Sequence, residues 1–318
     1  MGTITGIPQV DLAQFVHGNS SEKAAFVQEL GKAFSEIGFV SVTNHGIPLE
    51  LVNRFFALST EFFAMQSDNK TKYEVNGGAG QRGYTSIGKE HAKHSNVGDL
   101  KEFYQFGQEL PEGHELENEY PANIYVAEMP EYNKVARDLY VSFEKSGEYL
   151  LQAIALYLGL DVDYFKKHIE GGNSILRAIH YPPITSEPKS AIRAEEHEDI
   201  NLITLLFGAS ADGLQVRPIG HDWIDVKALG DSIVINVGDM LQRLANNTLK
   251  STTHRVVNPP RELWGTSRIS IPFFLHPRSD MDLTCLTSCI TEENPLQYEP
   301  ITAGAYLDER LREIGLKK

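Results

Sequence analysis

The feature that most constrains the fold is a series of short, strand-like runs that fills the second half of the chain after Gly171 and Gly172. Each run is alternating or continuously apolar, and turn-forming residues separate it from the next, which is typical of β-strands. The runs cover residues 175–181, 201–207, 214–217, 223–226, 232–237, 254–257 and 268–275. Many short strands of this kind predict a β-sandwich or barrel.

The first half of the chain shows helical periodicity instead. Apolar residues recur at helical intervals over residues 20–37 and 131–158, and Gly38 and Gly159 end the two patterns. Between them, residues 39–43 alternate as a short strand and lead into a further helix. This half is therefore expected to be rich in helices.

Two stretches are predicted to be surface loops: residues 75–98, which are rich in glycine, and residues 107–123, which are acidic and contain proline. No linker is long enough to separate two domains, so one shared core is expected. The predicted protein is mainly β with flanking helices: an α-rich N-terminal region, residues 1–170, packed on the core and not independent; a β core, residues 171–302; and a C-terminal helix, residues 303–318.

Composition narrows the choice of partners. The 318 residues are 41% hydrophobic, enough for one large core, and 29 Lys+Arg against 43 Asp+Glu give a formal charge of −14. Such a surface repels phosphate backbones and anionic lipids, so no nucleic-acid or membrane partner is expected. Cys285 and Cys289 are the only thiols, too few for a disulfide framework, which predicts a cytoplasmic location. A monomer or a weak homo-oligomer is expected.

Three residues form a candidate metal site. Alternate residues of a strand face the same side, so His197 and Asp199 project together while Glu198 points away. His254 opens a later run, and two histidines with one carboxylate make the facial triad that binds non-haem Fe(II) with positions left open. The His-x-Asp spacing alone is a weak signal, because a chain with 11 histidines and many acids produces it by chance.

A second set of residues strengthens this hypothesis. Arg268 and Ser270 lie two apart on one predicted strand and present a guanidinium and a hydroxyl on one face, which suits a carboxylate ligand. Tyr181 adds a hydroxyl from a neighbouring strand, which ends at Pro182 and Pro183. Taken alone, Arg268 is equally consistent with a surface ion pair and Tyr181 with a core residue.

These residues belong to a longer pattern that resembles the Fe(II)/2-oxoglutarate-dependent oxygenases of the isopenicillin N synthase-like superfamily. The resemblance covers almost the whole chain. Its motifs are, in order, Ile7-Pro8-x-Val10-Asp11-Leu12, Glu36-x-Gly38-Phe39, Asn44-His45-Gly46-Ile47, Asp99-Leu100-Lys101-Glu102-Phe103, Tyr181-Pro182-Pro183, His197-x-Asp199, Gly238-Asp239-Met240-Leu241-Gln242, Lys250-Ser251-x-x-His254-Arg255-Val256 and Arg268-x-Ser270. It implies that the β half is a double-stranded β-helix, or jelly roll, with helices packed outside.

The resemblance also implies six ligand residues and a chemistry. The residues implied for Fe(II) are His197, Asp199 and His254, and those implied for the far carboxylate of the co-substrate 2-oxoglutarate are Arg268, Ser270 and Tyr181. The implied reaction uses O2, hydroxylates, desaturates or cyclises a small molecule, and releases succinate and CO2, with ascorbate as a reductant for reactivation. One departure is Ile179, where many plant relatives carry an asparagine that donates to the co-substrate.

Two other functions stay open at this point. Isopenicillin N synthase and aminocyclopropanecarboxylate oxidase share the scaffold and the Arg-x-Ser motif but need no 2-oxoglutarate. The motif therefore does not separate a 2-oxoglutarate-independent iron oxidase from a 2-oxoglutarate enzyme. A noncatalytic jelly-roll sensor that merely retains the metal ligands is the less favoured third interpretation.

Three residues are predicted to contact the substrate. Phe274 lies on the same strand face as Arg268, farther along it, and Arg177 shares a face with Tyr181. The Arg177 guanidinium must meet either an acceptor group of the substrate or a neighbouring acid, because an unpaired buried charge is costly. Tyr104 belongs to an aromatic cluster that either closes the cavity or packs in the core.

Overall fold

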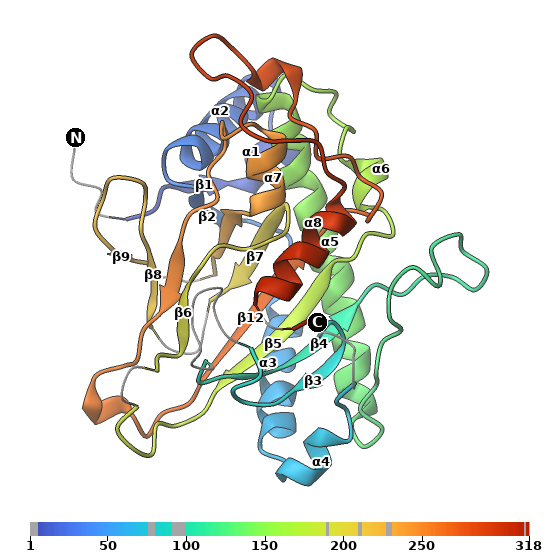
Figure 1. Ribbon diagram of the computed structural model, residues 1–318, viewed down its shortest axis with the longest axis vertical. Coiled ribbons are helices and arrows are strands. Elements are labelled where there is room, and N and C mark those ends of the chain that lie inside the picture. Colours follow the sequence, from blue (N-terminus) through green and yellow to red (C-terminus); the bar gives the residue numbers. More distant parts are fainter. Residues whose placement is uncertain are drawn as a thin grey trace.

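The structure, a computed structural model, describes residues 6–75, 80–90, 99–188, 191–208, 212–226, 231–314 and 316–317. Its centre is a pair of β-sheets, and helices cover the outer side of the larger sheet (Figure 1). This arrangement confirms the predicted class, a mainly β protein with flanking helices.

The larger sheet takes strands from both halves of the chain. Its central strands, in order, are β10 (Ile233–Val237), β7 (Ile203–Phe207), β12 (Arg268–Leu275) and β5 (Ile175–Tyr181). The first half extends both edges, with β2 (Phe39–Thr43) and β1 (Gln9–Asp11) beyond β10, and β4 (Glu102–Gly107) and β3 (Gly83–Thr85) beyond β5. The N-terminal region is therefore not only helical. The loop predicted at residues 75–98 contains β3, while its residues 76–79 and 91–98 lie outside the described part of the chain.

The smaller sheet faces the larger one. Its strands, in order, are β6 (Ala194–His197), β11 (His254–Val256), β8 (Leu214–Val216) and β9 (Ile224–Asp225). From β5 to β12 the chain passes back and forth between the two sheets, which is the winding of a jelly roll. Apolar side chains of both sheets, among them Phe39, Leu214 and Val256, meet between them and form a second core beside the cavity described below.

Three long helices cover the outer face of the larger sheet. α5 (Pro130–Tyr157) contacts β4, β5, β7 and β12, and α2 (Ser20–Glu36) and α3 (Leu49–Phe63) pack against it (Figure 1). The ring of Phe143 on α5 stacks on Phe273 of β12 with 5.3 Å between the ring centroids. Gly147 allows this close approach, because a Cβ at that position would lie 2.2 Å from Leu275 Cδ1. Helices of the first half and strands of the second half thus share one core.

The turn from α2 into β2 shows how local sequence sets these elements. Asn19 and Glu22 close a capping box at the start of α2. At its end, Gly38 adopts a φ of 78°, which glycine reaches at little cost, and the chain passes directly into β2. The predicted helix, glycine stop and strand are all confirmed here.

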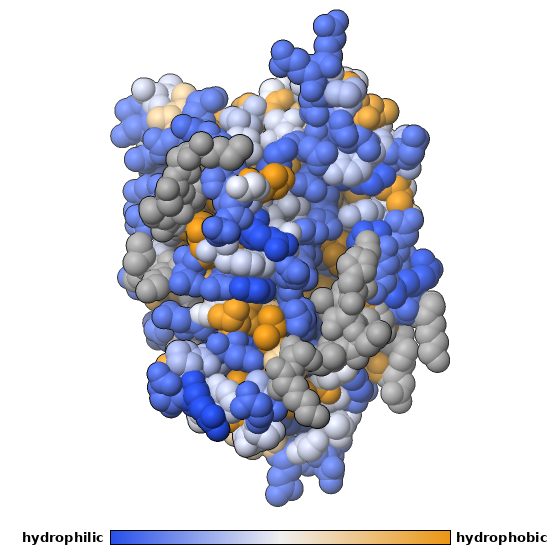
Figure 2. Space-filling view, turned by 60° about the vertical axis from the view of Figure 1, so that its left-hand side comes forward, coloured by the Kyte–Doolittle hydropathy of each residue, from blue (hydrophilic) through white to orange (hydrophobic). Residues whose placement is uncertain are grey.

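The remaining helices are short, apart from the one near the C-terminal end. They are α1 (Leu12–His17), α4 (Ser67–Thr71), α6 (Lys166–Ile169), α7 (Asp239–Leu244), the 3₁₀ turns Arg261–Leu263 and Thr287–Cys289, and α8 (Ala303–Glu313). None of the helices in the described ranges is long and apolar enough to cross a membrane. The face shown in Figure 2 is mostly hydrophilic, with apolar residues in separate patches.

Candidate active site

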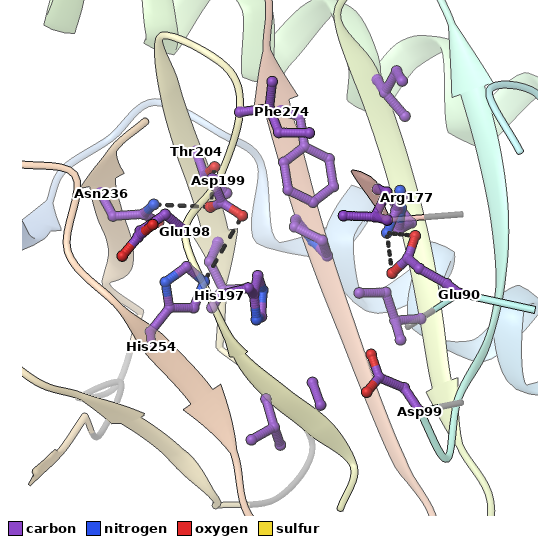
Figure 3. Close-up of a pocket in the computed structure, with 18 of the residues that line it drawn as sticks. Glu90, Asp99, Arg177, His197, Glu198, Asp199, Thr204, Asn236, His254 and Phe274 are labelled. Atoms are coloured by element: carbon purple, nitrogen blue, oxygen red, sulfur yellow. Dashed lines mark hydrogen bonds and ion pairs between the residues drawn. The ribbon is translucent and has the colours of Figure 1, made fainter. Parts of the chain in front are cut away.

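A cavity of about 530 Å³ is lined by residues of both sheets and of α8. In Figure 3, His197, Asp199 and His254 lie on one side of it, Arg177 and Glu90 lie on the other, and the ring of Phe274 lies between them. Such a cavity, with convergent polar and titratable groups, is the natural candidate for an active site.

The predicted triad comes together at this cavity. His197 ends β6, Asp199 follows two residues later, and His254 opens β11 directly opposite His197 in the antiparallel pair. The two imidazole rings lie 4.4 Å apart between centroids, and His254 Nε2 lies 3.8 Å from Asp199 Oδ1. One ligand atom from each residue lies within 4.8 Å of the others, which is the spacing of a metal site.

Hydrogen bonds behind the triad orient its ligand atoms. His197 Nδ1 donates to the carbonyl of Glu195 at 2.6 Å and His254 Nδ1 to that of Thr252 at 3.1 Å, since a carbonyl oxygen only accepts. This leaves the lone pair of each Nε2 for a metal. On the third ligand, Asp199 Oδ2 accepts from Thr204 Oγ1 at 2.6 Å and from Asn236 Nδ2 at 2.8 Å, which leaves Oδ1.

The charge state of the triad also suits a metal. Burial, followed by the neighbouring His254, lowers the pKa of His197, so its imidazole is neutral at pH 7. Burial alone raises the pKa of Asp199, but the two histidines and the bonds from Thr204 and Asn236 outweigh it and lower that pKa. Two imidazoles and one carboxylate are the donor set of a non-haem Fe(II) site with open positions, so the residues fit the implied metal.

The predicted carboxylate-binding residues also line this cavity. Arg268 of β12 pairs in register with Tyr181 of β5, and Ser270 pairs with Ile179 on the same sheet face. The Arg268 guanidinium carbon lies 5.1 Å from the centre of the Tyr181 ring. All three polar side chains are buried, and burial lowers the pKa of Arg268 without bringing it near neutrality. The structure thus brings the six predicted residues to one cavity.

Comparison with known proteins decides the family. Two family models match the chain: the N-terminal model of the non-haem dioxygenase in morphine synthesis over residues 7–128, and the 2OG-Fe(II) oxygenase superfamily over residues 172–277. The 2-oxoglutarate-Fe(II) type oxidoreductase hxnY of Emericella nidulans is 30% identical, over 99% of this chain and 93% of its own length. The chain belongs to the 2-oxoglutarate-Fe(II) oxygenase superfamily.

Solved structures agree with this assignment. A 2OG-Fe(II) oxygenase family protein from Caulobacter crescentus is 40% identical to this oxygenase, with a TM-score of 0.87 over 98% of this chain and 100% of that one. A full-length protein of Neurospora crassa, solved in complex with alpha-KG and thymine, is 30% identical, with a TM-score of 0.83 over 96% of both chains. The oxygenase is accordingly a 2-oxoglutarate-dependent dioxygenase that uses Fe(II) and acts on a small molecule.

The two predicted substrate residues Arg177 and Phe274 both line the cavity of the oxygenase. The Arg177 guanidinium is already partnered: its Nε donates to Gln105 Oε1 at 2.6 Å, and its Nη1 lies 3.4 Å from a carboxylate oxygen of Glu90. It also lies 4.2 Å from the Phe103 ring centre and 5.0 Å from that of Phe274. Of the two partners expected for Arg177, the structure supplies the neighbouring acid.

The position of Tyr104 contradicts its predicted contact with substrate. Its side chain points to the helix-covered face of β4, where it packs on Phe62 with ring centroids 4.9 Å apart, and it is fully buried. Its hydroxyl donates to the carbonyl of Ile124 at 2.7 Å. Since residues alternate along β4, Phe103 and Gln105 face the cavity side and Tyr104 cannot. The core alternative is the right one.

Sequence reasoning missed several residues of this site. Glu90 and Lys101 line the cavity as a buried ion pair with 2.6 Å between their charged atoms. His276 lines it as well, and its Nδ1 is buried with no hydrogen-bond partner in the described part of the chain. The alternation of β12 from Arg268 through Phe274 extends to His276, so the sequence pattern could have identified that residue. Glu90 was not, because it lies on a loop.

Proposed function

We propose that the six predicted residues form the reaction centre of the oxygenase. In this proposal the metal ligands are His197, Asp199 and His254, and the residues that bind the far carboxylate of 2-oxoglutarate are Arg268, Ser270 and Tyr181. The observation that carries it is that the oriented ligand atoms of the triad and the buried guanidinium of Arg268 line one cavity. Bound together, Fe(II) and 2-oxoglutarate supply activated O2, with release of succinate and CO2.

The residues of this chain contribute preorganisation. Thr204 and Asn236 hold the Asp199 carboxylate, so it does not have to reorient when the metal binds. Arg268 provides a charge-assisted hydrogen bond to a carboxylate from a buried position, where such a bond is strong. Apolar residues of α8, including Leu307 and Leu311, line the cavity and limit the access of water to it.

For the reaction type, we propose hydroxylation of a small molecule that packs on Phe274 and hydrogen-bonds to Arg177. The proposal is supported by relatives whose names or ligands specify small molecules: the proline hydroxylase buaE of Petromyces alliaceus is 33% identical over 96% of this chain, and the Neurospora crassa protein was solved with thymine. Because Glu90 balances the charge of Arg177, the substrate need not be an anion. It needs a hydrogen-bond acceptor, which the guanidinium can meet.

An anaerobic titration tests the reaction centre. The protein is loaded with Fe(II) and titrated with 2-oxoglutarate, and the visible metal-to-ligand charge-transfer band is followed. We expect the band to saturate, and admission of O2 to yield succinate slowly without substrate and faster when a substrate is present; thymine and L-proline are the first probes. Substrate oxidation without any band or succinate would instead identify a 2-oxoglutarate-independent oxidase.

We also propose that the oxygenase is cytoplasmic and works as a monomer or a weak homo-oligomer. Cys285 and Cys289 are both free and buried, which suits a reducing compartment. Light scattering coupled to gel filtration at several protein concentrations measures the assembly, and a stable dimer at the lowest concentration would contradict it. Fractionation of cells that express the protein tests the location.

A further inference from the structure

Lys101 is a buried lysine of the cavity wall for which the reaction centre above has no role. It is 7% exposed, and its ammonium contacts two carboxylates, Glu90 Oε1 at 2.6 Å and Asp99 Oδ2 at 2.8 Å. An ammonium has three N–H donors, so among the described residues these two contacts leave one donor. The residue lines the same cavity as the triad and Arg268.

The register of the larger sheet places Lys101 beside the co-substrate residues. β12 and β5 pair Arg268 with Tyr181, and β5 and β4 pair His180 with Glu102. Lys101, one residue before Glu102, therefore lies at the level of Tyr181. Alternation puts it on the cavity side together with Phe103 and Gln105. A guanidinium on β12, a phenol on β5 and an ammonium on the residue that precedes β4 thus lie at one level of the larger sheet.

A hydrogen-bonded chain ties Lys101 to the metal side as well. Asp99, which accepts from Lys101, also accepts from the backbone N–H of Glu195 at 3.2 Å. The carbonyl of Glu195 in turn accepts from His197 Nδ1. The ammonium is close enough for its charge to lower the pKa of His197 and for Tyr181 to affect the pKa of Lys101. Lys101 therefore lies between the tyrosine and the metal-binding strand.

The charge of Lys101 is permanent. Burial lowers the pKa of its ammonium, but Glu90 and Asp99 outweigh burial and raise that pKa above its ordinary value. One step along the sheet, the cavity-facing residue is Ile179, which offers no donor. A dianion that extends from Arg268 toward the triad would pass an apolar side chain there and would find Lys101 as an additional cation of the cavity wall.

We propose that Lys101 is a further 2-oxoglutarate-binding residue, whose ammonium donates to the co-substrate between the Arg268 end and the metal. This inference rests on the proposed reaction centre. This binding role is distinct from the structural role of Lys101, whose ion pairs would stabilise the fold whether or not the co-substrate is present. An experiment must therefore distinguish binding of 2-oxoglutarate from general stability.

Four variants make that distinction. Lys101→Met removes the charge, and Lys101→Arg keeps it. The double variant Lys101→Met with Glu90→Gln removes one positive and one negative charge, so the remaining Arg177 and Asp99 still balance. Lys70→Met is the matched control, because Lys70 is 8% exposed and pairs with Glu102 at 2.7 Å away from the cavity lining.

Each variant is loaded anaerobically with Fe(II) and titrated with 2-oxoglutarate through the charge-transfer band, and iron content and Tm are measured alongside. We expect Lys101→Met and the double variant to weaken 2-oxoglutarate binding by about tenfold or more at unchanged iron content. Lys101→Arg is expected to bind close to wild type. Lys70→Met is expected to lower Tm and leave 2-oxoglutarate binding unchanged.

Wild-type 2-oxoglutarate affinity in the double variant would overturn the role of Lys101, and so would an equal loss in Lys70→Met. A loss in Lys101→Arg as large as that in Lys101→Met would overturn a role based on charge. These failures differ from failure of the reaction centre itself, which would appear as the absence of the band in the wild-type protein.

Discussion

The two ends of the cavity are built in different ways. At the proposed metal and co-substrate end, all side chains except that of Asp199 come from strand positions set by the register of the jelly roll, and buried hydrogen bonds hold Asp199. At the proposed substrate end, Arg177 of β5 contacts Glu90 from a loop, and α8 supplies apolar residues from far along the chain. On the proposed assignment, the reaction machinery belongs to the central strands, while selectivity depends on peripheral elements that can vary without disturbing it.

The largest effect is expected at the metal end. Replacement of His197, Asp199 or His254 by alanine is expected to abolish turnover, because three protein ligands leave no redundancy. Iron content after anaerobic loading and succinate formation are the measurements. His17→Ala, at an exposed position of α1, is the control and is expected to keep both. Full activity of any triad variant would show that the replaced residue is not an iron ligand.

The next effect concerns the co-substrate. Arg268→Gln loses a charge-assisted hydrogen-bond pair worth about 1.5 to 3 kcal/mol, so the affinity for 2-oxoglutarate is expected to fall about 10- to 150-fold at unchanged iron content. The charge-transfer titration measures it. Arg255→Gln serves as the control, since Arg255 stacks on Trp223 with 4.0 Å to the ring centre and does not line the cavity. An unchanged affinity would place the carboxylate site elsewhere.

The ion-pair cluster of Glu90, Lys101 and Arg177 is expected to affect stability. Glu90→Gln deprives two buried cations, Lys101 and Arg177, of a partner and is expected to lower the free energy of unfolding by about 3 kcal/mol. Although burial raises the pKa of Glu90, Lys101 and Arg177 lower it to about 2 from an ordinary 4.5. A carboxyl group whose pKa is lowered by folding stabilises the protein at pH values above its ordinary pKa. This stabilisation is lost as the pH falls toward the pKa of the group in the folded protein. Denaturation of both proteins should therefore differ most above pH 4.5 and converge near pH 2.

Arg177→Gln is expected to separate the two ends of the cavity. Oxidation of substrate should fall about tenfold through the loss of one charge-assisted hydrogen bond. Slow succinate formation without substrate and iron loading should stay near wild type, because Arg177 is not among the residues proposed to bind iron or 2-oxoglutarate. A parallel fall of both activities and of Tm would show that Arg177 is only a brace between Glu90 and Gln105.

The smallest effect is expected from Tyr104, which packs in the core. Tyr104→Phe removes one buried hydrogen bond, to the carbonyl of Ile124, and should cost about 1 kcal/mol of stability. Activity and 2-oxoglutarate binding should not change, because the ring packs among helix-side aromatic residues away from the cavity. A change in substrate selectivity would reopen its role as a substrate contact. Thermal unfolding and a kinetic comparison with wild type check both statements.

The sequence predicted the part of the site on β5 and β12 well, since alternation and register bring Arg268, Ser270 and Tyr181 to one cavity. It located β5 and β12 to the residue and the long helix α5 within one residue. It failed for β6, whose four residues are mostly polar and charged and lack an apolar pattern. Tyr104 was misplaced because an aromatic cluster alone does not show which face of a strand is covered by helices.

Glu90 and α8 could not be predicted as parts of the site for another reason. Glu90 belongs to a loop, so no period ties its side chain to a face. The apolar stripe of α8 predicted a helix with one buried face. Whether that face packs on the outer side of the sheet or lines the cavity is decided by tertiary contacts. Register within a sheet can be read from spacing, whereas the docking of a peripheral element depends on contacts that no local pattern contains.

The pairing of β2 with β10 has a consequence for the order in which the protein folds. β2 ends at Thr43, whereas its partner begins at Ile233, and most of the jelly roll lies between them in sequence. During synthesis the N-terminal strand emerges first and keeps an unpaired hydrogen-bonding edge until β10 has been made. Closing so long a loop carries an entropic cost and slows folding. The larger sheet is therefore expected to be completed late, and nascent chains in which this edge of β2 is still unpaired are the ones most prone to aggregation.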